Sequence, residues 1–118
     1  MRTIIKAWFI ALLTLSALAS CQQNPHRMDM SSAVQGAKTK EDHEALAEHY
    51  EQAAKDAEAK VEEHKKLLDQ YKRHSYLYGR QGDTFIEHCE SLIGSYQKVV
   101  DANTAIAKMH RQMANNAK

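Results

Sequence analysis

The sequence predicts an all-α fold, an antiparallel two-helix hairpin of the coiled-coil type, over residues 39–118. Apolar residues recur at steps of three and four along two long stretches, about residues 40–74 and 84–115. The segment between them, residues 75–83, contains two glycines and interrupts both patterns, so we expect a turn there. A chain of 118 residues has room for one such domain.

The first twenty residues have the pattern of an export signal. Arg2 and Lys6 supply positive charge, and residues 7–18 form an apolar stretch of the length found in signal peptides. A permanent membrane helix takes about 20 apolar residues, which is longer than this stretch. We therefore expect residues 1–20 to be a signal that is removed on export.

The signal ends at residues 18–21 (LASC), which resemble the lipobox of bacterial lipoproteins. The resemblance implies that Cys21 receives a lipid, becomes the first residue of the mature protein and anchors it to a membrane. Gln22 follows, and in Gram-negative lipoproteins the absence of Asp at this place implies the outer membrane, facing the periplasm. Ordinary secretion is the alternative, because residues 17–19 also satisfy an A-x-A cleavage rule.

Residues 21–38 show no helical or alternating period and contain Pro25, the one proline of the chain. This composition predicts a lipidated, flexible tether. It would lift the helices off the membrane surface.

The first helix is predicted from about Lys40 to about His74. Thr39, with Asp42 three residues later, forms a capping-box pattern at its start. Residues 53, 57 and 61 follow one another at two consecutive steps of four, and this spacing predicts that the coil straightens locally. The stripe expected in the core consists of Leu46, Tyr50, Ala53, Ala57, Val61, His64, Leu68 and Tyr71.

The second helix is predicted over about residues 84–115, with Thr84 and Glu87 as a second capping box. Its stripe alternates steps of four and three without a break, which is typical of a bundle helix. This stripe consists of Phe85, Cys89, Leu92, Tyr96, Val99, Asn103, Ile106, His110 and Met113, and it is widened on one flank by Ile86, Ile93, Val100 and Ala107.

Charge predicts how the two helices lie. Each begins acidic and ends basic, so an antiparallel arrangement sets the acidic half of one beside the basic end of the other. Two helices alone leave the outer part of each stripe in water, so we expect a homo-oligomer or a partner helix. Two hairpins forming a four-helix bundle are the simplest arrangement, and an extended monomer is the alternative.

Seven histidines are unusual in so short a chain. A turn centred near Gly79 brings His110 beside His49, with Met109 and Met113 flanking it. Imidazole and thioether groups are ligands for copper, and imidazole with thiolate also suits zinc. Copper or zinc binding is therefore an alternative function, through these four residues or through the pair His88 and Cys89.

Structural roles compete with the metal hypothesis. His64 and His110 lie on the stripes, where the hydroxyls of Tyr96 and Tyr50 would satisfy them, and His26, His43 and His74 would be solvated. Acid sensing is another alternative, because histidines across the contact would charge near pH 6 and repel one another.

Cys89 also has two interpretations. It is a small apolar residue of the stripe, or it forms an intermolecular disulfide with its copy in a symmetric dimer.

Composition argues against several classes of function. Removal of Arg2 and Lys6 from the 16 basic residues leaves 14 against 15 acidic ones, so the mature chain offers nucleic acid no basic surface. There is no nucleophile with a base at a recognisable spacing, no phosphate loop and no length for an enclosed cleft. We therefore expect no enzymatic activity and no small-molecule substrate.

Several motifs resemble an uncharacterised group of small exported proteobacterial helical-hairpin proteins, over roughly residues 47–113. These motifs are residues 48–51 (EHYE), 53–55 (AAK), Glu63-His64, Gly79 with Gly82, and 88–90 (HCE) with Leu92 and Tyr96. The resemblance implies the hairpin fold and no particular activity. A fainter similarity to the murein lipoprotein rests on the lipobox, the heptad pattern and Lys118, and it implies a peptidoglycan tether.

Together these observations predict a non-catalytic cell-envelope lipoprotein whose helical hairpin is a structural or protein-interaction module.

Overall fold

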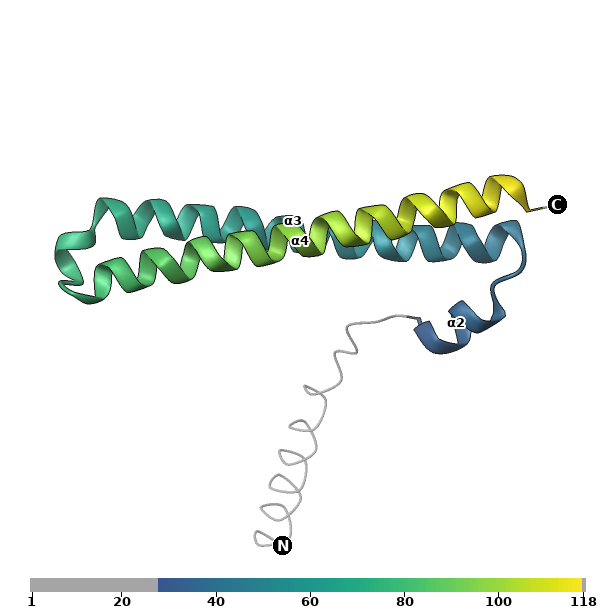
Figure 1. Cartoon of the computed structure of the whole chain (residues 1–118), viewed down its shortest axis with the longest axis horizontal. Helices are drawn as coiled ribbons and strands as arrows, with labels where there is room; N and C mark the ends of the chain where they lie inside the picture. Colours follow the sequence, from purple (N-terminus) through teal and green to yellow (C-terminus); the bar gives the residue numbers. More distant parts are fainter. Residues whose placement is uncertain (1–27, 118) are drawn as a thin grey trace, which may run out of the picture. The chain divides into compact units, whose positions relative to one another are not determined.

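The computed structural model describes residues 28–117. It contains α2 (Met30–Gly36), α3 (Lys40–Arg73), the short 3-10 helix η1 (Ser75–Leu77) and α4 (Gln81–Asn116). The long helices α3 and α4 lie side by side and antiparallel as an extended hairpin, with η1 in the connection (Figure 1). The predicted all-α hairpin is confirmed.

α2 lies within the segment for which the sequence predicts a flexible tether. None of its seven residues is buried. A helix without a buried face has no apolar period, which is why hydropathy gave no sign of it. The predicted signal peptide, Cys21, Pro25 and His26 lie outside the described residues.

α3 begins behind the predicted capping box. The Thr39 hydroxyl accepts a hydrogen bond from the Asp42 backbone N–H at 3.2 Å, and the Asp42 carboxylate accepts one from the Thr39 N–H at 2.9 Å. These bonds satisfy backbone donors that the first turn leaves open. Backbone N–H groups of Lys38 and Thr39 also hold the pKa of Asp42 below its ordinary value.

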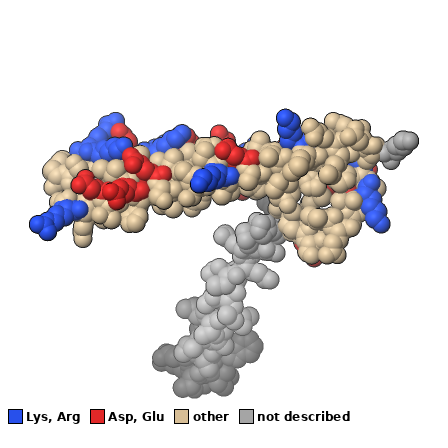
Figure 2. Space-filling view, in the orientation of Figure 1, with Lys and Arg blue, Asp and Glu red and all other residues tan. Residues whose placement is uncertain are grey.

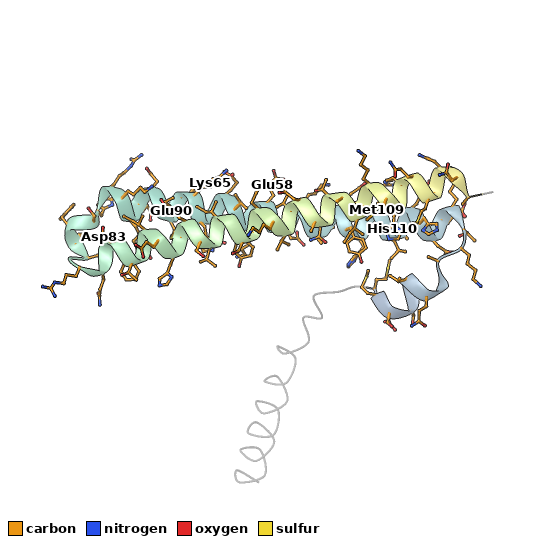
Figure 3. The ribbon with its side chains drawn as sticks, in the orientation of Figure 1. Glu58, Lys65, Asp83, Glu90, Met109 and His110 are labelled. Atoms are coloured by element: carbon orange, nitrogen blue, oxygen red, sulfur yellow. The ribbon has the colours of Figure 1, made fainter. Side chains whose placement is uncertain are left out.

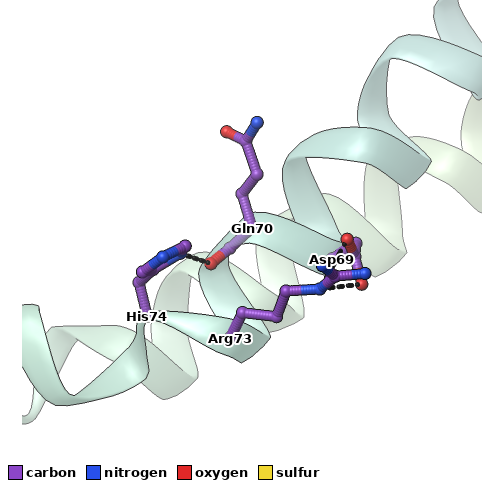
Figure 4. Close-up of polar contacts among 4 residues, drawn as sticks. All are labelled: Asp69, Gln70, Arg73 and His74. Atoms are coloured by element: carbon purple, nitrogen blue, oxygen red, sulfur yellow. Dashed lines mark hydrogen bonds and ion pairs between the residues drawn. The ribbon is translucent and has the colours of Figure 1, made fainter.

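The other end of α3 is closed by basic side chains (Figure 4). Arg73 Nε lies 3.0 Å from the Asp69 carboxylate one turn earlier. The His74 ring donates from Nδ1 to the Gln70 carbonyl oxygen at 3.0 Å. Both positions place basic side chains where the helix dipole is negative.

α4 begins three residues earlier than the sequence predicts, and Thr84 is not its cap. Arg80 precedes the helix and makes no side-chain capping bond. The chain turns instead at Gly79, whose φ is 53°, and Gln81 N–H donates to the Tyr78 carbonyl at 3.1 Å. The η1 turn thus leads directly into α4, so backbone bonds from the turn replace the capping box expected at Thr84.

The buried stripe of α3 differs from the prediction at two alanines, Ala47 and Ala54, and Ala47 has none of its surface exposed. Ala54 is buried, with 8% of its surface exposed, whereas Ala53 is only partly covered. The step from Tyr50 to Ala54 to Ala57 restores the alternation of four and three, so the predicted local straightening is wrong. Adjacent alanines made both choices plausible in sequence, and the continuous heptad is the one the packing adopts.

α4 is rotated from the prediction by less than one residue position, because Cys89 of the predicted stripe is still buried. Ile93 and Val100 are partly covered and Ala107 is buried against α3, whereas Leu92 and Val99 are 40% and 44% exposed. Consecutive residues point about 100° apart around a helix, so the predicted flank replaces the row of Leu92 and Val99 in the contact. Cys89, Tyr96 and His110 of the predicted stripe stay in that contact. Small residues such as Ala107 allow the helices to approach closely.

The two sides of the hairpin have opposite character. On one side ion pairs join the helices: Arg111 makes two hydrogen bonds of 3.0 Å to the Glu51 carboxylate, and Lys72 Nζ lies 3.0 Å from Glu90. On the other side α4 carries residues spaced by seven, which we name the apolar row. Its members are Phe85, Leu92, Val99, Ile106 and Met113.

Both charge signs are interspersed along the face of the hairpin seen in Figure 2. Figure 3 shows Glu58 and Lys65 on α3 and Asp83 and Glu90 on α4 in the same view. The predicted charge complementarity of antiparallel helices is therefore realised as pairs on one side, which leaves the apolar row on the other.

Candidate functional site

A histidine cluster occupies the end of the hairpin where α3 begins and α4 ends. We define it as His43, His49, Tyr50 and His110. His43 Nδ1 and His110 Nδ1 lie 3.2 Å apart, and the two rings are stacked with centroids 5.4 Å apart. Only one of two imidazole nitrogens at this separation carries the shared proton when both rings are neutral.

Tyr50 links the remaining rings of the cluster. Its ring stacks on His110 with centroids 5.9 Å apart and an interplanar angle of 9°, and the His49 ring meets it edge-on at 5.3 Å. His43 and Tyr50 are one heptad apart on α3, so both face α4. The prediction that His43 is solvated is therefore wrong.

Burial and charge act together on His110. Desolvation disfavours the imidazolium, and a charged His43 would repel it, so the pKa of His110 lies below its ordinary value. Beside it, hydrogen bonds from Arg111 hold the pKa of the Glu51 carboxyl below its usual range. This end of the hairpin therefore combines a fixed ion pair with a histidine that favours its neutral form.

The residues of the predicted copper or zinc site do not converge. His110 faces His43 and Tyr50, whereas Met109 and Met113 are both 49% exposed. Figure 3 labels Met109 and His110 as neighbours on α4. Within residues 28–117, no group of three or more His, Cys, Asp or Glu side chains is arranged to hold a metal ion. The described geometry gives a site with these ligands no support.

The pair His88 and Cys89 is also separated. Cys89 is buried between the helices with 5% of its surface exposed, whereas His88 is exposed. The thiol is free. A disulfide between two copies would require the hairpin to open at this point, so the position favours the small apolar role of Cys89.

His64 is a third histidine in the contact between α3 and α4, after His43 and His110. Its ring stacks on Tyr96 with centroids 5.6 Å apart, and its buried Nδ1 has no hydrogen-bond partner. The sequence predicted hydroxyl partners for His64 and His110, but both meet a tyrosine ring face. Stacking on Tyr96 packs the imidazole ring of His64 but leaves its Nδ1 without a hydrogen-bond partner.

Sequence reasoning missed an aromatic cluster at the turn. Tyr71 stacks on Phe85 with centroids 5.1 Å apart, and Tyr78 meets both rings edge-on at 5.3 and 5.5 Å. The sequence assigned Tyr78 to a loop, since periodicity ends there. The signal that could have found it is the pairing of Tyr71 with Phe85 about the turn centre.

None of the helices in the described part of the chain is long and apolar enough to cross a bilayer. Comparisons with protein-family models, with curated proteins and with solved structures give no match.

Proposed function

We propose that the protein is a non-catalytic cell-envelope lipoprotein whose hairpin binds another helix through the apolar row. The observation that carries this proposal is the exposure of Leu92, Val99 and Met113, which lie seven and fourteen residues apart along one side of α4. Scattered apolar residues are normal on a surface, but a contiguous row beside a polar rim is typical of an interaction site. A heptad spacing fits the grooves of a second helix.

The ion-paired side of the hairpin restricts binding to the apolar row. Its charges are already paired between α3 and α4, at Glu51 with Arg111 and at Lys72 with Glu90. A partner gains little by covering exposed ion pairs and more by removing apolar surface from water. We therefore expect partners at the apolar row and none at the paired side.

In-cell photocrosslinking of the full chain tests this directly. A benzophenone amino acid at Val99 should give a discrete protein adduct, and the same group at Thr104, exposed on the paired side, should give none. Equal yields from both positions, or no adduct from either, would refute the proposed binding surface.

The envelope location rests on Cys21, which lies outside the described residues. Labelled palmitate should be incorporated into the full chain and lost on Cys21→Ser. Labelling that persists in the variant, or is absent from the wild type, would contradict the lipoprotein assignment.

A second candidate function is a response to acid, which the 3.2 Å contact of His43 with His110 favours. Protonating both rings would place two like charges in contact between the helices. Carboxylates at the same end, Glu44, Glu48 and Glu51, act on Arg111 and would soften this repulsion. Reversible loss of helicity between pH 7.5 and pH 5, which bracket the ordinary histidine pKa of about 6.5, would support this role, and unchanged helicity would contradict it.

A further inference from the structure

α4 carries a second heptad stripe along the flank of its contact with α3, and this stripe meets α3 at Phe85, whose ring stacks on Tyr71. Steps of three and four alternate through it without a break, which is the spacing of a coiled-coil contact. No member of this stripe is Asp, Glu, Lys or Arg. The stripe consists of Phe85, His88, Leu92, Ser95, Val99, Ala102, Ile106, Met109, Met113 and Asn116.

The stripe extends the apolar row over nearly the whole of α4 and is accessible. Leu92, Val99, Met109 and Met113 are 40–49% exposed, and Ser95 and Ala102 are also exposed. A helix that shows one contact stripe to α3 and another to water has the pattern of an inner bundle helix. One neighbouring helix is therefore missing along the second stripe.

Building on the proposed function, we propose that the missing neighbour is α4 of a second copy of this chain, packed antiparallel across a two-fold axis near residues 99–102. Residues of the two copies whose numbers sum to about 201 would then face one another. This register brings Phe85 opposite Asn116 and Leu92 opposite Met109. The ends of the two stripes coincide, so no apolar member is left beyond the contact.

The charges of α4 favour its own copy as the occupant and fix the direction. Glu87 lies in its first third and Lys108 in its last, whereas Glu90 and Arg111 are already paired with α3. An antiparallel pair sets each acidic end beside the partner's basic end, whereas a parallel pair stacks like charges. The same helix thus supplies both complementary halves, as a two-fold contact requires.

Charges beside the stripe are available for such contacts. Along residues 28–117, Glu87, Lys98 and Lys108 make no ion pair. Lys98 and Asp101 have opposite charges and lie on either side of the middle of the stripe. A two-fold axis there places Lys98 of each copy near Asp101 of the other copy. Asp101 accepts a hydrogen bond from Gln97 at 3.1 Å in the same helix.

Disulfide trapping of the full chain distinguishes this arrangement from the others. Single cysteines are introduced in a Cys89→Ala background, which leaves no thiol between α3 and α4. Ala102→Cys, near the axis, should form a disulfide-linked dimer under mild oxidation. Leu92→Cys alone should not, because its copy would lie about 17 residues, or roughly 25 Å, away along the helix.

Mixing Leu92→Cys with Met109→Cys chains should restore the crosslink, because the register places these residues opposite each other. Thr104→Cys, on the paired side, is the matched control and should stay monomeric. Crosslinking of Leu92→Cys alone as readily as Ala102→Cys would overturn the antiparallel arrangement.

The outcomes separate this inference from the proposed function. A photocrosslink from Val99 to a different protein, without any cysteine dimer, would overturn the second copy as occupant and leave the binding surface standing. Absence of both the photocrosslink and the cysteine dimers would refute the two together.

Discussion

At the scale of single residues, His110 and His64 in the contact between α3 and α4 differ in whether their ring nitrogens have partners. His110 Nδ1 meets His43 at 3.2 Å, whereas the buried Nδ1 of His64 has no partner. A buried polar atom without a hydrogen bond costs about 1–3 kcal/mol. The unpaired nitrogen of His64 therefore lowers the stability of the hairpin.

Replacing His64 with leucine should raise the free energy of unfolding by about 1 kcal/mol, because an apolar group removes the unpaired nitrogen. Chemical denaturation of the full chain measures this. His88→Leu, at an exposed position, is the control and should change stability by no more than about 0.5 kcal/mol. A destabilised His64→Leu chain would mean that stacking on Tyr96 outweighs the unpaired atom.

His110 predicts how stability changes with pH. Because its pKa is lowered in the folded chain from the ordinary 6.5, the unfolded chain binds more protons, and the free energy of unfolding falls as pH drops from 6.5 through the folded pKa. Stability is then highest above pH 6.5. Carboxyls with lowered pKa, such as Glu51, lose their contribution only below about pH 4.5.

Thermal unfolding of His110→Leu at pH 7.5 and pH 5 should show a smaller loss than the wild type, because the variant lacks the group that titrates in this window. His88→Asn should retain the wild-type loss. Equal pH dependence in the wild type and in His110→Leu would show that His110 does not carry it.

At the scale of elements, the turn and the helices place different demands on glycine. Gly79 has a φ of 53°, which L residues rarely adopt, whereas Gly94 lies in α4 with nothing within 4 Å of an added Cβ. Gly79→Ala should destabilise the hairpin by about 1 kcal/mol, and Gly94→Ala should stabilise it by about 0.5–1 kcal/mol. Denaturation of the two variants measures both, and stabilisation by Gly79→Ala would show that the turn relaxes.

Periodicity predicted the existence of both long helices, which have 34 and 36 residues, and the charge pattern predicted their antiparallel direction. Periodicity did not predict the rotation of α4. Leu92 and Ile93, or Val99 and Val100, are adjacent apolar residues, so sequence alone cannot decide which of them faces α3. The choice depends on how closely Ala107 and Ala114 let the helices approach, which is a property of the pair.

The histidine cluster was predicted only in part, for a related reason. Residues of the two helices were expected to face each other when their numbers lie equally far before and after the turn centre. This rule placed His110 near Tyr50 and His49, as found. The contact with His43 depends on the reach and rotation of two rings, which a sum of residue numbers does not contain. The same limit applies to Met109 and Met113, which lie outward once α4 is rotated.

At the scale of the whole molecule, rotation of α4 decides what the hairpin can do. The helices pair their charges on one side, and on the other side Leu92, Val99 and Met113 of the apolar row are 40–49% exposed. Burying such a row is the main favourable contribution to helix association. Whether the apolar row is covered by another helix therefore decides what the hairpin does.

The most direct test is the native mass of the full chain purified from membranes, compared with Val99→Lys and with Thr104→Lys. We expect a complex of two chains in the wild type and in Thr104→Lys, and a single chain in Val99→Lys, since a charge would be buried without a partner. A Val99→Lys chain that keeps the wild-type mass, or a wild type that is a single chain with no partner, would contradict the account.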